Sequence, residues 1–337
     1  FVQTNVLGTA VMLNCAKNAW ELPDGTFKPG KKFLHVSTDE VYGSLSEDGG
    51  YFYETTPYAP HSPYSASKAG SDMLVKAYMD TYHFPANITN CSNNYGPYQF
   101  PEKLIPLIIN NALHGKKLPV YGDGKNVRDW LYVEDHAKAI DMVQEQGRLF
   151  ETYNVGGHNE KQNIQIIEII IETLQEMLAD DDPRKALVSK DLITYVADRK
   201  GHDRRYAIAP DKIKEEIGWY PETMFKEGIK KTIAWYFEHE DWMNNVTSGD
   251  YQKYYNEMYE EFPDCREENA GQTEETGLCI PEWGRRATPF PFWRIWAGAH
   301  GSRPVLPGSR TVLPGSRTVP PERSCKAKCF SYRRMNA

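Results

Sequence analysis

The sequence of 337 residues predicts an α/β fold in which helices cover both faces of a parallel, doubly wound sheet. Two observations predict it. Short apolar runs alternate with longer amphipathic segments, which is the pattern of parallel strands joined by crossover helices. Polar clusters follow the apolar runs at residues 37–42, 92–99 and 156–163, and the loops at the carboxyl ends of parallel strands form the ligand site of such sheets.

The individual elements are expected from local patterns. Apolar residues recur at helical spacing over residues 1–18, which predicts an amphipathic helix. The apolar run 33–36 leads into polar residues 37–40, as expected of a buried strand that ends in a loop. By the same criteria the other strands are expected at 86–91, 118–121, 152–155 and 193–196, and the other helices at 64–83, 102–114, 134–145, 164–178, 210–217 and 225–238.

The composition is that of a folded protein without a membrane span. With 40% hydrophobic and 25% charged residues, the chain is too apolar to be wholly disordered. The longest apolar candidate, 164–171, is interrupted by Gln165 and Glu168 and is far shorter than the roughly 18–20 residues a span needs. The chain opens on Phe1 without a basic or apolar leader, so no signal peptide is expected. The first 262 residues carry only Cys15 and Cys91, which favours a cytoplasmic location.

Charge is distributed unevenly between the two ends of the sequence. Residues 276–337 hold 11 Lys or Arg and 2 Asp or Glu, a net charge of +9. Subtracting these from the totals of 39 and 46 leaves 28 and 44 in residues 1–275, a net charge of −16. A nucleic-acid-binding surface needs clustered cations, so the acidic body argues against nucleic acid as the main partner.

Residues 263–337 are expected to be a disordered basic tail, separate from a folded core over residues 1–262. Near-copies of one short unit begin at Gly301, Gly308 and Gly315, and no apolar periodicity supports a helix or strand there. A tail that binds nucleic acid or membrane is the alternative. Cys325 and Cys329 lack a second pair of ligands at zinc-site spacing, so no metal site is expected.

A first group of residues with chemical potential lies at 64–68. Tyr64 and Lys68 are four residues apart, so on a helix they lie on one side, one turn apart. A tyrosine is a poor base at neutral pH unless a cation stabilises its phenolate, and Lys68 is placed to do so. A surface Tyr and Lys on an amphipathic helix is the alternative interpretation of this pair alone.

A second group follows the first predicted strand, 24 residues before Tyr64. The segment 37–43 reads Ser-Thr-Asp-Glu-Val-Tyr-Gly, with the carboxyl groups of Asp39 and Glu40 side by side. Two adjacent carboxylates are costly to hold together unless each has a separate task. The alternative is a helix start that Thr38 or Asp39 caps, which becomes less favoured once the Tyr and Lys follow.

Together these residues resemble the extended short-chain dehydrogenase/reductase family, whose base is the Tyr of Tyr-x-x-x-Lys with a Ser or Thr upstream. Within that family, segment 37–43 is most similar to the dTDP-glucose 4,6-dehydratases; epimerases of the same fold usually lack the Asp-Glu pair. The resemblance covers residues 1 to about 262. It implies a Rossmann-like sheet and a smaller C-terminal substrate-binding region, mainly 93–262. Further matching segments lie at 93–98, 101–106, 119–124, 128–130, 154–157 and 198–203.

The resemblance implies NAD-mediated oxidation of a dTDP-sugar at C4, elimination of water across C5–C6 and return of the hydride to C6. Tyr64 would take the proton of the 4-hydroxyl, with Thr38 bonded to that oxygen and Lys68 steadying the phenolate. Glu40 would act as base at C5, while protonated Asp39 gives its proton to the departing 6-hydroxyl. An epimerase needs only the redox half of this reaction, which is why it can lack the acid and base.

The same matching implies the binding residues. Those for NAD are Thr4, Ser37, Tyr64, Lys68 and Asn94. Those for the nucleotide sugar are Thr38, Asn93, Lys103, Leu104, Pro119, Tyr121, Arg128, Asn163, Arg199 and His202. Among them, Arg128 and Arg199 would pair with the pyrophosphate, because guanidinium groups suit phosphate oxygens. Pro119 and Tyr121 would flank the base.

The sequence departs from the family in two places. No glycine-rich turn of the kind that cradles a dinucleotide pyrophosphate occurs in it. The family places that turn before the point where this chain begins, so about three βα units, at roughly 30 residues each, are expected to be missing. We therefore expect this chain alone to bind NAD poorly. Lys200 stands where the family usually has Pro.

Three further expectations follow from the resemblance. Helices 1–18 and 64–83 are those through which the family dimerises, so a homodimer is expected. A UDP-sugar dehydratase or epimerase of the same fold is the nearest alternative activity, because the loop around Pro119 and Tyr121 does not separate thymine from uracil. A catalytically inactive fragment with a scaffolding role is the alternative from another class, and the intact Tyr64 and Lys68 argue against it.

Overall fold

The computed structural model describes residues 1–249 of the chain. The predicted tail over residues 263–337, its repeats and its cysteines lie outside the described residues, and the domain boundary at residue 262 stays a prediction. Among residues 1–249, no helix combines the length and the apolar character that crossing a membrane requires.

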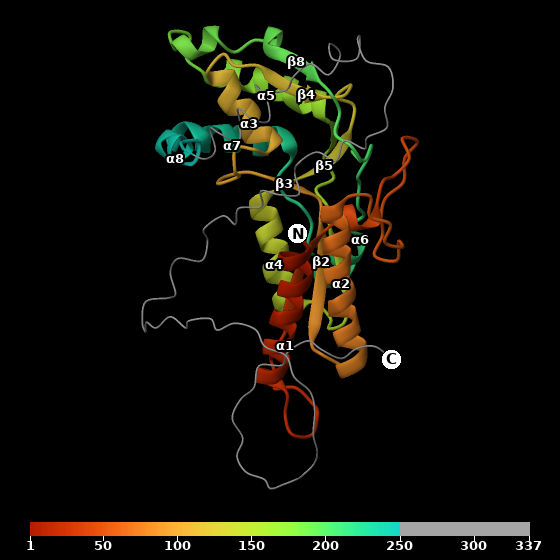
Figure 1. Ribbon diagram of the computed structural model, residues 1–337. Coiled ribbons are helices and arrows are strands. Elements are labelled where there is room, and N and C mark those ends of the chain that lie inside the picture. The colour runs from red at the N-terminus through yellow and green to blue at the C-terminus, as the bar shows by residue number, and fades with distance from the viewer. Residues whose placement is uncertain (250–337) are drawn as a thin grey trace, which may run out of the picture. The chain divides into compact units, whose positions relative to one another are not determined.

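A parallel three-stranded sheet forms the centre of one part of the described chain (Figure 1). Its strand order is β1-β2-β6, with β1 at Phe33–Thr38, β2 at Ala86–Cys91 and β6 at Thr152–Val155. The carboxyl ends of all three strands lie at one edge of the sheet. β1 pairs in parallel with β2, from Phe33 opposite Ala86 to Thr38 opposite Cys91, and β2 pairs in parallel with β6.

Helices cover both faces of this sheet. On one face, α1 (Gly8–Trp20) and α2 (Pro63–Tyr82) enclose an apolar core around Leu13, Val75 and Phe84. On the other face, α4 (Val133–Gln146) and α6 (Asp211–Ile217) enclose a second core around Val143 and Trp219. A short π-helical turn, Val2–Leu7, precedes α1 and packs against α2. The central sheet is therefore doubly wound, as the alternating sequence pattern predicted.

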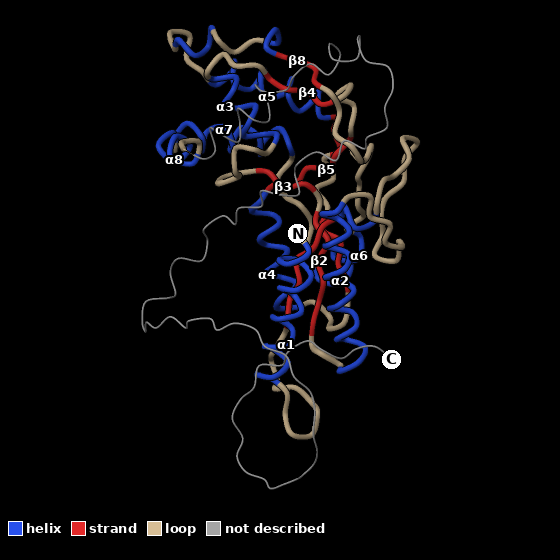
Figure 2. Tube along the Cα trace, in the orientation of Figure 1, coloured by secondary structure: helices blue, strands red, loops and turns tan. Residues whose placement is uncertain are grey.

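The rest of the described chain adds two further sheets, one of three strands and one of two, and a largely helical layer (Figure 2). The strands are β3 (Asn93–Tyr95), β4 (Leu118–Tyr121), β5 (Val127–Tyr132), β7 (Glu160–Gln162) and β8 (Ile193–Val196). The helices are α3 (Leu104–Leu113), α5 (Asn163–Met177), α7 (Phe225–Glu238) and α8 (Glu240–Val246). The largest apolar core of the described chain holds these helices together, with Ile108, Ile170 and Ile229 fully buried.

The expected α/β class and parallel strands are confirmed, and three differences remain. The strands form three sheets instead of one, and β5 pairs with β7 in antiparallel orientation. β3, β5 and β7 were not expected as strands. β3 and β7 are only three residues long, and β5 carries the polar residues Arg128 and Asp129 inside the protein, so none shows the apolar run that marks a strand.

Candidate functional site

The start of α2 places Tyr64 and Lys68 beside the end of β1. Ser62 caps the helix: its hydroxyl accepts from the Ser65 backbone N–H at 3.0 Å, and the Ser65 hydroxyl accepts from the Ser62 backbone N–H. Tyr64 therefore falls in the first turn and Lys68 one turn later. Lys68 Nζ donates to the carbonyl oxygen of Val36 at 2.8 Å, which ties the helix to β1.

Thr38, Asp39 and Glu40 lie where β1 ends. The turn Asp39–Tyr42 is a short 3-10 helix, and the Thr38 hydroxyl accepts a hydrogen bond from the Glu40 backbone N–H at 3.3 Å. Asp39 is only 2% exposed, and its Oδ1 accepts from the Thr38 hydroxyl at 3.3 Å. Its other oxygen, Oδ2, has no hydrogen-bond partner among the described residues. Thr38 thus caps the short helix, which was the alternative interpretation of this segment, and the buried acid Asp39 lies next to it.

The protein environment makes Asp39 a weak acid. Burial, reinforced by the negative charges of Glu40 and Asp129, raises the pKa of Asp39 to about 8. Burial also raises the pKa of Glu40, while the Arg128 guanidinium acts in the opposite direction. Asp39 is therefore protonated at neutral pH and able to donate a proton, whereas Glu40 faces a cleft with a cation nearby.

Tyr64 does not have the lowered pKa that its spacing from Lys68 predicted. Burial, followed by the charges of Glu40, Cys91 and Asp39, raises the pKa of Tyr64 to about 12. Burial lowers the pKa of Lys68, whose ammonium group bonds the Val36 carbonyl. The direction is opposite to the expected one because burial disfavours the phenolate most, and the negative charges of Glu40 and Asp39 disfavour it further. The same charges indicate that Asp39 and Glu40 lie close to Tyr64.

A cleft of about 570 Å³ opens next to Glu40, a volume suited to a nucleotide-sized ligand. It brings together residues from β3, α3, β4, β5, α5 and the loop 198–203, which are far apart in the sequence. Nine of the ten predicted substrate residues line it, and only Thr38 does not. They are Asn93, Lys103, Leu104, Pro119, Tyr121, Arg128, Asn163, Arg199 and His202.

The two arginines of the cleft are held differently. Arg128 is 7% exposed, and its guanidinium lies 4.3 Å from the Tyr206 ring centre while Nη2 donates to the Asp203 carbonyl oxygen at 2.9 Å. Arg199 is exposed, and its guanidinium lies 4.2 Å from the ring centre of Tyr121. Arg128 is therefore a fixed cation at the floor, and Arg199 is an adjustable one at the rim.

The loop 198–203 is anchored at both ends in spite of Lys200. His202 Nδ1 lies 2.6 Å from Asp198 Oδ1, and Asp203 accepts from the Tyr206 hydroxyl and lies 2.6 Å from His61 Nδ1. Burial is the largest effect on His202 and lowers its pKa, so the ring is largely neutral at pH 7. The position where the family usually has Pro thus still carries a loop that lines the cleft.

The predicted NAD residues are more scattered. Asn94 lines the cleft, and its side chain is fixed by His136 Nδ1 at 2.9 Å and by the Ser92 carbonyl at 3.0 Å. Thr4 is exposed on the π-helical turn before α1. Ser37 is buried, and its hydroxyl donates to Asp72 at 2.7 Å, so that hydroxyl is already engaged inside the protein. The assignment of these residues to NAD stays a prediction.

The chemistry of the donors near Tyr64 fits the ribose of a dinucleotide. Within residues 1–249, Lys68 Nζ makes one hydrogen bond, to Val36, and an ammonium group has three donors. Lys68 also lies at the carboxyl end of β1, the edge where parallel sheets bind such ligands. Lys68, Tyr64 and Asn94 are therefore the residues that would hold this end of NAD.

Several cleft residues were not predicted as site residues. They are Ser62, Gln99, Glu102, Leu107, Trp130, Lys200, Gly201, Asp203 and Tyr206. A strand pattern could have found Trp130, because alternate residues of β5 point to the same side, and Arg128 is two positions earlier. Nothing local indicates Gln99. Its side chain reaches the cleft because its Nε2 donates to the Asn94 carbonyl at 2.8 Å.

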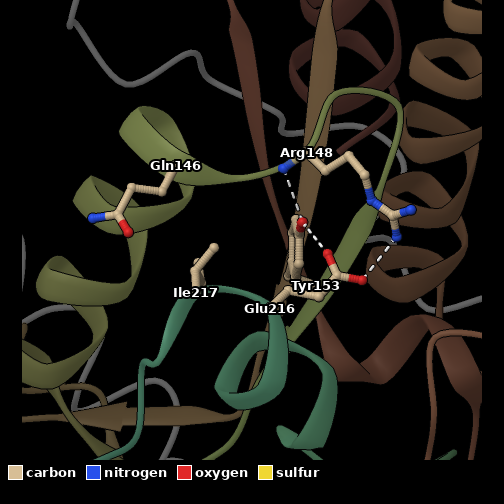
Figure 3. Close-up of a pocket in the computed structure, with 5 residues that line it drawn as sticks. All are labelled: Gln146, Arg148, Tyr153, Glu216 and Ile217. Carbon is tan, nitrogen blue, oxygen red and sulfur yellow. Dashed lines mark hydrogen bonds and ion pairs between the residues drawn. The ribbon is translucent and has the colours of Figure 1, made fainter.

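A second hollow, of about 360 Å³, lies at the amino end of β6 and is lined by Gln146, Arg148, Tyr153, Glu216 and Ile217. Figure 3 shows that its polar groups bond one another. The Tyr153 hydroxyl accepts from the Arg148 backbone N–H at 3.0 Å and donates to Glu216 at 2.7 Å, and the Arg148 guanidinium bonds Glu216 at 2.8 Å. This closed network leaves the cleft beside Glu40 as the better candidate site.

Comparison with known proteins adds independent support. The family model for GDP-mannose 4,6 dehydratase matches residues 1–232. A dTDP-glucose 4,6-dehydratase of Shigella flexneri is 53% identical over 268 residues, which is 77% of this chain and 73% of that protein.

Solved structures agree with the sequence relatives. The crystal structure of a dTDP-glucose 4,6-dehydratase from Bacillus anthracis in complex with NAD matches with a TM-score of 0.65 and 50% identity, over 73% of this chain and 71% of that chain. A UDP-glucose 4-epimerase from Thermotoga maritima, solved with UDP-glucose, matches with a TM-score of 0.60 and 25% identity over 70% of each chain. The dehydratases are thus about twice as similar in sequence as this epimerase.

Proposed function

The chain belongs to the dTDP-glucose 4,6-dehydratases of the GDP-mannose 4,6 dehydratase family, and we propose that its cleft converts dTDP-glucose to dTDP-4-keto-6-deoxyglucose. The reaction oxidises C4, eliminates water across C5–C6 and returns the hydride to C6. Because the hydride taken from C4 returns to C6, the overall reaction has no net consumption of NAD. One observation supports it above the others: a buried acid with a pKa of about 8 adjoins a second carboxylate that faces a nucleotide-sized cleft.

Asp39 and Glu40 carry the elimination step. Glu40 takes the proton from C5, which the neighbouring 4-ketone has made acidic. Asp39 is protonated at neutral pH and donates its proton to the 6-hydroxyl as it leaves as water. Because burial is the main cause of the raised pKa, the acid is ready before any ligand arrives. An epimerase has no elimination step and needs no such pair.

Tyr64, Thr38 and Lys68 carry the oxidation step. Tyr64 accepts the proton of the sugar 4-hydroxyl in its phenolate form, after its own proton has left, and the Thr38 hydroxyl bonds the same oxygen. Protonation of Asp39 removes one of the charges that oppose the Tyr64 phenolate. When NAD+ is bound, it supplies the hydride acceptor for C4 and the hydride donor for C6. Lys68 and Asn94 would hold its nicotinamide ribose end, and Thr4 and Ser37 remain further candidates.

The remaining cleft residues bind the nucleotide part of the substrate. Arg128 and Arg199 pair with the two phosphates, one as the fixed and one as the mobile cation. The apolar residues Leu104 and Pro119 and the Tyr121 ring flank the base. Further contacts to the nucleotide and phosphates come from Asn93, Lys103, Asn163 and His202.

The test is turnover of the purified chain with either dTDP-glucose or UDP-glucose, at NAD+ raised until the rate no longer increases, because the chain alone is expected to bind NAD poorly. The 4-keto product is followed by its absorbance in alkali, and a Glu40→Gln variant serves as the control. We expect dTDP-glucose to be converted and the Glu40→Gln variant to form no product. Preferential conversion of UDP-glucose, or release of a 4-epimer without dehydration, would contradict the proposal.

We also propose a homodimer in the cytoplasm. The helices α1 and α2 pack together and leave large apolar side chains exposed, with Leu7 at 57%, Val11 at 51%, Met12 at 59% and Met73 at 58%. Such a patch on a helix pair suits a second copy of the same helices. Sedimentation of the chain and of a Met73→Glu variant tests this; a wild-type monomer would contradict it.

A further inference from the structure

We propose that Asp72 is a positioning residue of this site. Its side chain fixes the position of α2, which carries Tyr64 and Lys68, relative to the turn that follows β1. The inference rests on the roles proposed above for Tyr64 and Lys68. Asp72 itself touches neither of the reacting groups, and it acts through the strand and the helix that carry them.

Asp72 is a buried carboxylate with a fixed set of partners. It is 0% exposed. The Ser37 hydroxyl donates to Asp72 Oδ2 at 2.7 Å, and the Tyr58 hydroxyl donates to the same oxygen at 3.0 Å. On the other side, His35 Nε2 lies 3.0 Å from Oδ1, but this ring nitrogen pairs with the Ser71 hydroxyl at 3.1 Å, and Oδ1 makes no hydrogen bond among the described residues. A buried carboxylate is costly unless donors surround it, so these contacts determine where the side chain sits.

These contacts join α2 to three consecutive residues of β1. The side chains of His35 and Ser37 point to the same side of the strand, and both contact Asp72. Between these two residues, the carbonyl of Val36 accepts a hydrogen bond from Lys68 Nζ. The next residue is Thr38, where the catalytic turn begins. A shift of α2 along β1 would therefore displace Tyr64 from that turn, and displacements near 1 Å can cost about 100-fold in rate.

Asp72 also places a negative charge one turn from Lys68. The charged or titratable groups that face Lys68 are Asp72 and Cys91, and both favour its protonated form, while burial opposes it. The groups that face Asp72 include His35, Tyr58 and Lys76. Burial lowers the pKa of Lys76, and the charge of Asp72 raises it. Removal of the Asp72 charge therefore lowers the pKa of Lys68. The same charge raises the pKa of Tyr64, so its removal acts on the phenol in the opposite direction, and the loss of position is what lowers turnover.

The kinetic test compares three variants that each alter the same carboxylate. Asp72→Asn removes the charge, Ser37→Ala removes the bond to β1, and Tyr58→Phe removes a bond to the same oxygen from outside β1. We expect the first two to lower kcat by about tenfold, with KM for dTDP-glucose changed by less than about twofold. Tyr58→Phe is the matched control, and its kcat should stay within about twofold of wild type.

A second measurement needs no turnover. Competitive acetylation of the chain across a pH series, read by mass spectrometry, gives the pKa of each lysine. We expect Asp72→Asn to lower the pKa of Lys68 by on the order of one unit, with Lys17 on α1 as the internal reference. Ser37→Ala keeps the charge of Asp72 and should leave the pKa of Lys68 unchanged. The pair of variants therefore separates the effect of the Asp72 charge from its effect on the position of α2.

The outcomes distinguish this inference from the proposed function. If Asp72→Asn and Ser37→Ala match Tyr58→Phe in kcat, and Lys68 keeps its pKa, the role of Asp72 is refuted while the dehydratase activity stands. If a Tyr64→Phe variant keeps full turnover, the proposed function itself fails. Should circular dichroism show that Asp72→Asn is unfolded, the comparison of Ser37→Ala with Tyr58→Phe decides.

Discussion

Replacement of Asp39 by Asn should stabilise the protein increasingly as the pH rises, although it removes a catalytic group. Asp39 has a pKa of about 8 in the folded chain and about 4 when unfolded. Between these values the folded state keeps a proton that the unfolded state has lost, so the free energy of unfolding falls as the pH rises. Asn is neutral at every pH and avoids this cost.

The size of the effect follows from the two pKa values. Each pH unit between them costs the wild type about 1.4 kcal/mol, so the window from about pH 4.5 to pH 7.5 amounts to on the order of 4 kcal/mol. The missing partner of Asp39 Oδ2 affects both side chains similarly and changes little with pH. The difference between variant and wild type should therefore be small at pH 4.5 and large at pH 7.5.

Urea unfolding at the two pH values measures this difference. The Asp39→Asn variant should gain several kcal/mol relative to wild type between pH 4.5 and pH 7.5, while its kcat falls by at least about 100-fold. Glu40 and Asp129 also titrate, but they are present in both proteins and cancel in the comparison. A stability difference that does not change with pH would refute the assignment of Asp39 as the neutral acid.

Three further predictions concern the other site residues. Tyr64→Phe should lower kcat by about 10³-fold without a change in unfolding free energy above about 1 kcal/mol; retained turnover would exclude Tyr64 as the base. In D2O the wild type should form product that carries deuterium at C5, as read by NMR, whereas Glu40→Gln should form none; labelled product from the variant would point to another base. Arg128→Lys should raise KM for dTDP-glucose by about tenfold, because a lysine cannot bind two phosphate oxygens in one plane; an unchanged KM would place the phosphates elsewhere.

Local patterns in the sequence were enough for most of the fold. Most helices and the strands β1, β2, β4, β6 and β8 begin and end within a few residues of their expected limits, as at 86–91, 152–155 and 225–238, whereas β5 and α8 were not expected. Amphipathic spacing and apolar runs report burial directly, and these elements are buried. The short strands β3 and β7 were not predicted, because they are strands only through their pairing with β5, which is distant in sequence.

The candidate site residues came from the sequence, through the resemblance to a known family, and nine of the ten substrate residues line the cleft. The protonation states of the catalytic candidates could not be predicted in this way. Asp39 and Glu40 are adjacent in sequence, but only the former is almost fully buried, and that difference gives Asp39 its pKa of about 8. Tyr64 has a raised pKa because the fold buries it and brings carboxylates to it, which its spacing from Lys68 did not reveal.

The sequence by itself thus determined most of the helices and the strands of the central sheet, since these depend on neighbours within a few positions, and its resemblance to a family named the candidate site residues. Only the tertiary structure decided which charges meet in one buried space. Burial and the approach of distant groups such as Ser37 and Asp72 set proton affinity and position, and both are properties of the packed chain.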